Sequence, residues 1–534
     1  MHPSTDTVSP PLVGARTARR SDSLQPLALP LVFIVALAAL GFVPPISDDA
    51  NFRWSLWGAA ALLAAWAAGL YVSAARAGRQ LAVQTSVRAQ HWLQACAHAS
   101  IFAYWGWYWP TVYDEALPRI ISQLVFAYAF DMLLVWSQRD DYTLGFGQFP
   151  IIFSTNLFLW FKPGWFHLQL LMIAVGFAGK DLIRWQKDGR RTHIFNPSSL
   201  TLSVFSLGLI ATGTTNITWG QEIAITQFFP PHMYLFLFLI GLPGQFLFGV
   251  TTMTMSAVLT TYLFGVAYFA ATGTYYFYDS YIPIAVFLGM HLLFTDPSTA
   301  PRTELGRLIF GATYGLTAVL LYKVLTDMGV PSFYDKLLQV PLMNLSIQAI
   351  DRAVRSPALR WLDPGRLAQG LVGRPRNAAY ISVWATAFVA MYMVGGVGDT
   401  HRGQYLPFWQ QACANGSQRG CAYLANVEAI YCNAGSAWAC NEWGILEDRF
   451  NLAGVGRGQD PMAAFGEGCE LGLDAACQNR GKLSAGDRSF VRTAPTPDDY
   501  PIVLRGTKAP IDHLSPEQLK ARACEQGWPG TCTQ

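Results

Sequence analysis

The chain has 534 residues, of which 52% are hydrophobic, 14% are aromatic and only 13% are charged. Soluble domains carry about 25% charged residues, so this composition indicates an integral membrane protein. The net charge of +3 gives no support for nucleic-acid binding.

Residues 1–25 are polar and place Arg16, Arg19 and Arg20 ahead of the first apolar run. Such a start is typical either of a signal peptide or of a cytoplasmic segment before an uncleaved first helix. We expect a cytoplasmic N-terminal segment, because many further apolar runs follow and no small-residue cleavage site stands out.

Twelve apolar runs follow, and most of them lie in a membrane domain over residues 26–326. They span 27–44, 54–75, 92–110, 119–137, 149–161, 165–179, 199–213, 232–250, 252–271, 281–294, 306–326 and 380–397. Several are shorter than the roughly 20 residues that cross a bilayer. Short spans interrupted by Gly or Pro are typical of broken helices. The predicted fold class is therefore all-α, a polytopic membrane helical bundle with broken helices.

Basic residues gather in three stretches, at 74–90, 180–193 and 327–379. The positive-inside rule places all three in the cytoplasm of a bacterial-type inner (plasma) membrane. The loop 327–379 then leads into a last transmembrane helix at 380–397, which makes the domain 399–534 extracytoplasmic. This arrangement requires an odd number of crossings, so at least one of the twelve runs is expected not to be a simple crossing.

Two similar motifs interrupt the apolar runs. The first is HIFNPSS, from His193 to Ser199, and the second is FTDPSTAPR, from Phe294 to Arg302. In each, an N-cap residue (Asn196 or Asp296) precedes Pro and Ser, which predicts a helix start. Helix N-termini suit anionic or electron-rich groups.

The likeness of these motifs suggests inverted repeats, whose half-helices would approach a shared site from opposite membrane faces. The alternative is two ordinary capped helices that follow loops.

The stretch from Lys180 to Ser199 and the stretch FTDPSTAPRTELGR resemble the NqrB/RnfD family. Its members are membrane subunits of the sodium-pumping NADH:quinone reductase and of the Rnf complex. The chain resembles the stand-alone UnbU-like relatives more closely, over about residues 90–326. The resemblance implies two inverted sets of helices that bind a flavin (FMN or riboflavin) and transfer electrons. It makes the following residues candidate cofactor ligands: His193, Asn196, Ser198, Ser199, Thr295, Asp296, Thr299 and Arg302.

One departure from the family concerns the covalent attachment of the flavin. Quinone reductase and Rnf subunits esterify FMN to a threonine in a Ser-Gly-Ala-Thr-like motif, which is not present here. The corresponding segment 211–218 reads ATGTTNIT, in which Thr214 and Thr215 are only weak matches. We therefore expect a non-covalent flavin or a different cofactor.

Five polar residues in or beside the apolar runs carry competing interpretations. His91 and His98 share a helix face and, with His167, have the residue type to ligate haem, although His91 is also placed to be solvated. His291 precedes the second motif and is a candidate to line its cavity. Asp131, inside an apolar run, is either a proton or cation relay or an acid hydrogen-bonded to a neighbouring helix.

Eight of the nine cysteines form four pairs with the spacing C-x-x-G-x-x-x-x-C. They are Cys413 with Cys421, Cys432 with Cys440, Cys469 with Cys477, and Cys524 with Cys532. The glycine suits a turn between two helices, which a disulfide would then join. Zinc is the rival interpretation, but its ligating cysteines stand closer together, so we expect disulfides and no metal.

The same pattern resembles cysteine-rich Sel1-like repeats over roughly residues 405–534, with an insertion at 481–515. This implies a disulfide-stapled α-solenoid. Because the tail follows a single span, we expect it to gain little from packing on the membrane domain and to dock a partner. The alternative is that the repeats only cap that domain.

The predicted function is a membrane electron-transfer protein that binds flavin and exchanges electrons with a membrane or extracytoplasmic redox partner. Membrane lipids are the other expected partners, and no catalytic residue is singled out. The alternatives are a transporter and a structural membrane subunit whose helical-repeat tail docks a partner protein.

Overall fold

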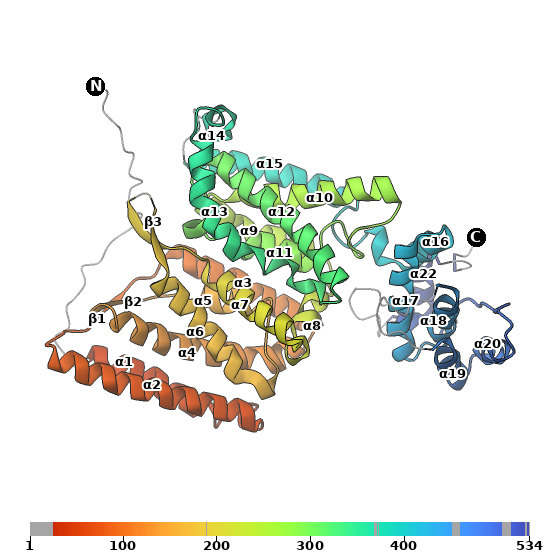
Figure 1. Cartoon of the computed structure of the whole chain (residues 1–534), viewed down its shortest axis with the longest axis horizontal. Helices are drawn as coiled ribbons and strands as arrows, with labels where there is room; N and C mark the ends of the chain where they lie inside the picture. Colours follow the sequence, from red (N-terminus) through yellow and green to blue (C-terminus); the bar gives the residue numbers. More distant parts are fainter. Residues whose placement is uncertain are drawn as a thin grey trace.

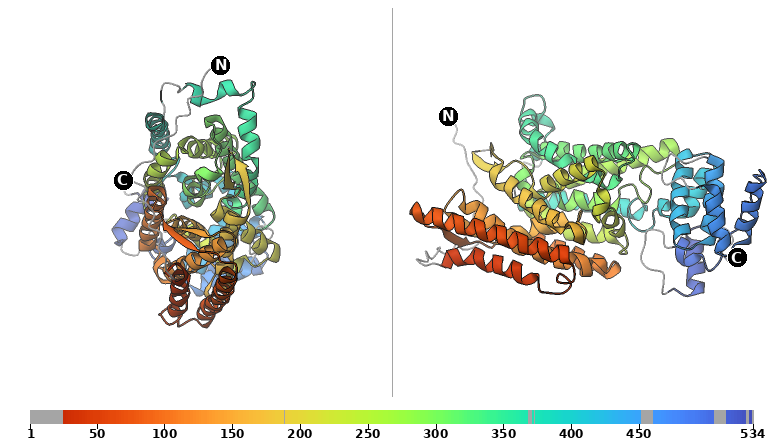
Figure 2. Two further views of the ribbon diagram at one scale, coloured as in Figure 1. Left: turned by 90° about the vertical axis from the view of Figure 1, so that its left-hand side faces the viewer. Right: turned by 60° about the horizontal axis from the view of Figure 1, so that its bottom comes forward.

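A computed structural model describes residues 25–187, 189–367, 371, 373–450, 460–504, 514–528 and 531–532. The predicted N-terminal segment 1–25 lies outside these residues, apart from Gln25. A helical bundle forms one part of the molecule, and the C-terminal tail lies at one end of this bundle (Figures 1 and 2).

Each of the twelve predicted apolar runs contains a helix. The longer helices of the bundle are α1 (Gln25–Leu40), α2 (Ala50–Arg76), α3 (Ala89–Tyr108), α4 (Leu117–Trp136), α6 (Phe166–Leu182), α7 (Pro197–Thr212), α9 (Met233–Phe248), α10 (Thr251–Thr272), α12 (Glu304–Asp327), α13 (Gln339–Val354) and α15 (Arg374–Met393). The shorter ones are α5 (Gln148–Asn156), α8 (Gly220–Thr226), α11 (Ile284–Leu292) and α14 (Pro364–Leu367).

Four helical segments are long and apolar enough to cross a bilayer, namely Ala50–Arg76, Val112–Trp136, Thr251–Thr272 and Glu304–Asp327. The outer face of α2 is itself apolar, since Trp54 and Leu62 are 63% and 75% exposed. An apolar surface of this kind is a liability in water and is satisfied by lipid. The helices therefore support association with a membrane.

The predicted helical class is confirmed, and two short strand pairs that the sequence did not predict accompany the helices. Strand β1 (Ala82–Thr85) pairs in parallel with β2 (Asp141–Leu144), and β3 (Arg184–Lys187) pairs in antiparallel with β4 (Arg190–His193). The second pair folds the basic stretch 180–193 into a hairpin, at the end of the bundle opposite the tail (Figure 1). We call this the hairpin end. Strands of four residues are too short to carry a clear apolar alternation, so the sequence pattern does not mark them.

The prediction that residues 327–379 form one loop is wrong. After α12 ends, α13 starts beside α7, where the Ser203 hydroxyl donates to the Leu338 carbonyl. At its other end Gln348 donates to the Gln186 carbonyl of the hairpin. Helix α13 thus runs back to the hairpin end of the bundle.

The return of α13 predicts that the two ends of the segment 327–379 face opposite sides of the membrane. In a Cys96→Ala background, cysteines at Met328 (64% exposed) and at Ala358 would report the two ends. A membrane-impermeant maleimide applied from the tail side should label Met328→Cys but reach Ala358→Cys only after permeabilisation. Equal labelling of both from one side would contradict a crossing by α13.

The tail consists of helical pairs joined by disulfides. Its helices are α16 (Leu406–Ala414), α17 (Gln418–Asn433), α18 (Ala437–Phe450), α19 (Pro461–Glu470), α20 (Asp474–Ser484), α21 (Tyr500–Val503) and α22 (Pro516–Glu525). All four predicted disulfides are confirmed, with one inside each cysteine pair. The glycine of each pair has a positive φ of 84–98°, the turn conformation that the spacing predicted. Disulfides indicate an oxidising compartment for the tail.

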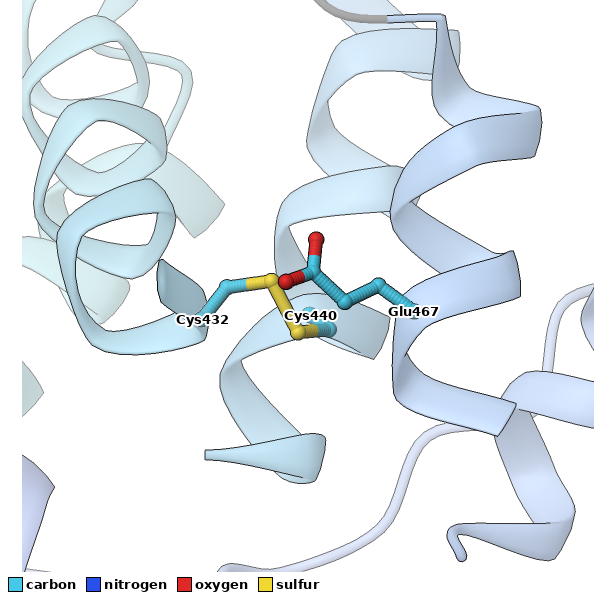
Figure 3. A group of neighbouring side chains, drawn as sticks. All are labelled: Cys432, Cys440 and Glu467. Carbon is cyan, nitrogen blue, oxygen red and sulfur yellow. A yellow bond between two sulfur atoms is a disulfide. The ribbon is translucent and has the colours of Figure 1, made fainter. Parts of the chain in front are cut away.

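Figure 3 shows Cys432, Cys440 and Glu467, whose sulfur and carboxylate atoms lie close enough to suggest a metal site. The two sulfurs are bonded to each other, with an S–S distance of 2.03 Å. They are therefore not thiolates, and the remaining carboxylate cannot hold a metal ion by itself.

The tail packs directly on the bundle, against the expectation that it would gain little from doing so. The Arg419 guanidinium donates to the Tyr275 and Tyr276 carbonyls, which follow α10. The rings of Tyr278 and Tyr423 stack with their centroids 4.0 Å apart. These contacts join the first helical pair of the tail to the bundle.

Several acidic side chains of the tail are buried or form ion pairs. Glu442 and Glu447 are buried, and Asp448 forms an ion pair with Arg488. Burial raises the pKa of Glu442 to about 6. Glu428 is fully buried, and neither of its carboxyl oxygens has a partner among the described residues. Burial raises its pKa well above the usual value.

Candidate functional site

The two motifs, about a hundred residues apart in the sequence, contact each other at the hairpin end. Asn196 caps α7 by accepting from the Ser199 N–H, and its side-chain amide donates to the Leu293 carbonyl at 2.9 Å. His193 Nε2 lies 3.0 Å from Asp296 Oδ2. The expectation that both motifs contribute to one site is supported by these contacts.

The predicted helix start at Asp296-Pro297 is wrong. Asp296 caps only the short turn Pro297–Thr299, and α12 begins at Glu304 behind its own cap, Thr303. The reason is local: Ala300 precedes Pro301, and a residue before proline avoids the helical conformation. Ala300 is indeed extended, with φ −109° and ψ 152°.

The expectation that the motifs approach from opposite membrane faces is wrong as well. Lys187 of the hairpin donates to the Ala300 carbonyl at 2.7 Å, which places the second motif at the hairpin end. The first motif follows β4 of the same hairpin directly. Helices α7 and α12 therefore both start at this end, and the pair of motifs does not support an inverted repeat.

A cavity of about 840 Å³ opens between the first motif, the second motif and α3. We call it the basic cavity, and its lining includes Arg88, Gln90, His91, Gln94, His98, Ser154, Lys180, His193, Asn196, Ser198 and Asp296. The first residues of α3, α5 and α7 all contribute to its wall. Three helix N-termini and two cations against one carboxylate favour an anionic ligand group.

The predicted ligands are distributed unevenly around this cavity. His193, Asn196, Ser198 and Asp296 line it, whereas Thr295 lines a smaller neighbouring cavity.

The other three predicted ligands line neither of these two cavities. Ser199 is buried, Thr299 contacts Asp296 through its hydroxyl, and the Arg302 backbone N–H donates to Asp351.

The carboxylate of Asp296 is held in its charged form. Burial acts to raise its pKa. The hydrogen bond and the charge of His193 outweigh this effect, with help from hydrogen bonds of the Ser298 N–H and the Thr299 hydroxyl. The pKa of Asp296 is therefore below its usual value. Asp296 therefore orients His193 and is not a proton donor near neutral pH.

His98 presents a hydrogen-bond acceptor to the basic cavity. Its Nδ1 lies 2.6 Å from the Gln94 carbonyl, which can only accept, so the proton of the neutral ring sits on Nδ1. Its Nε2 is buried without a partner in the described structure, and the residue is 1% exposed. A bound donor group would satisfy this atom.

The histidine set proposed for haem is not assembled. His91 and His98 line the basic cavity. His167 is exposed beside Trp165 near the start of α6, whereas the residue of α6 that lines the cavity, Lys180, lies near the end of this helix. At 1.5 Å per helical residue, this separates His167 from the cavity by about 20 Å.

The weak flavin-attachment candidates also lie elsewhere. Thr214 contacts Thr212 at the far end of α7 from the cavity, and Thr215 follows it.

Asp131 accepts from Tyr142 at 3.2 Å and from Gln148 at 2.9 Å, which supports the hydrogen-bonded interpretation of this acid.

Sequence reasoning missed Arg88 and Lys180 as site residues, because both served only as signals of orientation.

Comparison of the chain with family models, with curated proteins and with solved structures finds no match.

The double role of Asn196 predicts an unusually large effect of its removal. Asn196→Ala loses a helix cap, worth about 1 kcal/mol, and leaves the buried Leu293 carbonyl unpaired, at about 1–3 kcal/mol. The control is Ser417→Ala, which removes only the cap of α17. Thermal unfolding in detergent should show a clearly larger loss for Asn196→Ala, and equal losses would refute the link between the motifs.

Proposed function

We propose that this protein is a membrane electron-transfer protein that binds a flavin non-covalently in the basic cavity. The observation that carries the proposal is the cavity itself, where both motifs meet cations and helix N-termini. Its volume of about 840 Å³ lies within the range that is common for cofactor sites.

The residues of the cavity fit the two chemical ends of FMN. Arg88 and Lys180 offer charge for a phosphate, and the start of α7 offers a favourable dipole. Asn196, Ser198 and His98 offer hydrogen-bonding groups for a polar chain or ring edge. A bound flavin would supply the redox chemistry, and these side chains would bind and orient it.

The proposed topology follows from charge and redox chemistry. The hairpin end carries the basic stretch 180–193, which favours the cytoplasmic side of a bacterial-type inner membrane. The disulfide-bonded tail then faces the extracytoplasmic side. In this arrangement the protein exchanges electrons with a membrane or extracytoplasmic partner, as the likeness to NqrB/RnfD proteins implies. The Sel1-like helical pairs of the tail would present the surface for that partner.

The proposal predicts the visible absorption bands of an oxidised flavin in protein purified from native membranes. Denaturation should release the chromophore, because no covalent attachment is expected. A colourless protein would overturn the proposal, and the cavity would then suit a transported anion. A haem spectrum without flavin would overturn it too.

The charge of Lys180 provides a sharper test of the cavity. Lys180→Met should weaken FMN about tenfold or more but leave riboflavin, which lacks the phosphate, unchanged. The matched control is Lys323→Met, since Lys323 lies exposed on α12 and pairs with Asp327. Fluorescence titration measures both affinities, and equal affinity of Lys180→Met and the wild type for FMN would place the phosphate elsewhere.

A further inference from the structure

A second, smaller cavity adjoins the basic cavity inside the bundle. It has a volume of about 380 Å³, lies between α3, α9 and α11, and shares Gln94, Phe248 and Leu292 with the basic cavity. Its wall is mainly apolar, with Leu93 and Ile240 among its residues. We call it the apolar chamber.

Two buried side chains in the apolar chamber lack hydrogen-bond partners among the described residues. Gln245 is 2% exposed, and neither its amide nitrogen nor its amide oxygen is paired. His291 is 2% exposed, and its Nε2 is unpaired. Each unpaired buried polar atom costs stability, and a ligand bound in the chamber would offer partners to all three atoms.

The hydrogen-bonding character of the two side chains is defined. His291 Nδ1 lies 2.7 Å from the Phe287 carbonyl, so the neutral ring carries its proton there and Nε2 is an acceptor. The Gln245 amide offers one acceptor and two donors. The chamber therefore requires a ligand with an N–H next to a carbonyl, on an otherwise apolar body.

We propose that the apolar chamber holds the flavin ring, with the pyrimidine edge facing Gln245 and His291. That edge alternates carbonyl, N–H and carbonyl, which matches the donors and acceptors present, and the remaining ring matches the apolar wall. The side chain and phosphate then extend into the basic cavity towards Lys180. This inference rests on the proposed function and assigns the two ends of the ligand to the two cavities.

The test is a titration of the full-length protein, stripped of flavin, with FMN, riboflavin and lumichrome, a ring that lacks the side chain. Gln245→Leu should weaken all three about tenfold, the effect of losing a hydrogen bond to a buried group. Without ligand the variant should unfold at the same or a higher temperature than the wild type, because an unpaired amide is removed.

Gln339→Leu is the matched control. Gln339, on α13, is also buried, and its two amide atoms have no partner in the described part of the chain, but it lines neither cavity. It should leave all three affinities unchanged. If Gln245→Leu does not fold, Gln245→Glu keeps the shape and replaces the donor by an acceptor, which should also weaken all three ligands.

The outcomes separate this inference from the proposed function. Wild-type affinity for riboflavin and lumichrome in a folded Gln245 variant overturns the chamber assignment, while flavin binding itself stands. Loss of affinity in the Gln339 control to the same extent also overturns it. Failure of the wild type to bind any flavin overturns both.

Discussion

The hydrogen bonds of Asn196 are the interaction on which the hairpin end depends. Its side chain caps α7 and pairs with the Leu293 carbonyl, while its backbone N–H donates to Asn344 of α13 at 3.1 Å. Asn344 in turn donates to the Thr299 carbonyl. One asparagine thereby connects α7, the end of α11 and α13, which are far apart in the sequence. Because Asn196 and Asn344 are buried, these bonds are strengthened by their apolar surroundings and help to fix the geometry of the adjoining cavity.

Polar side chains inside the bundle fall into two groups. Gln123 and Asn156 exchange two hydrogen bonds of 3.0 and 2.8 Å, and Gln169 joins them, so these amides pair with one another as apolar surroundings require. The Gln245 amide and His291 Nε2 have no partner among the residues that the structure describes, and both side chains face a chamber beside the basic cavity. The contrast between paired and unpaired groups is the physical basis for placing a ligand there.

The features that the sequence predicted are those set by short stretches of chain. Cys432 and Cys440 pair because eight residues and one glycine determine both the turn and the contact. Asn196 caps α7 because its partner is Ser199, three residues on. The apolar runs become helices because their hydropathy is local as well.

The features that were missed depend on distant contacts. His193 and Asp296 meet only because the helices between them fold back, which no local pattern specifies. Helix α13 went undetected because buried Gln339, Asn344 and Asp351 lower its hydropathy, although its partners satisfy Asn344 and Asp351. In the sequence, Arg88 and Lys180 indicate only the orientation of the chain in the membrane. The fold brings both of them to one cavity.

The central claim is that a flavin occupies the joined cavities without a covalent bond. Native mass spectrometry of the protein, released from native membranes in detergent, measures this most directly. The account predicts a mass that exceeds that of the disulfide-bonded polypeptide by one FMN or riboflavin, with the excess lost on denaturation. The polypeptide mass alone under both conditions would contradict the account, and so would an excess mass that survives denaturation.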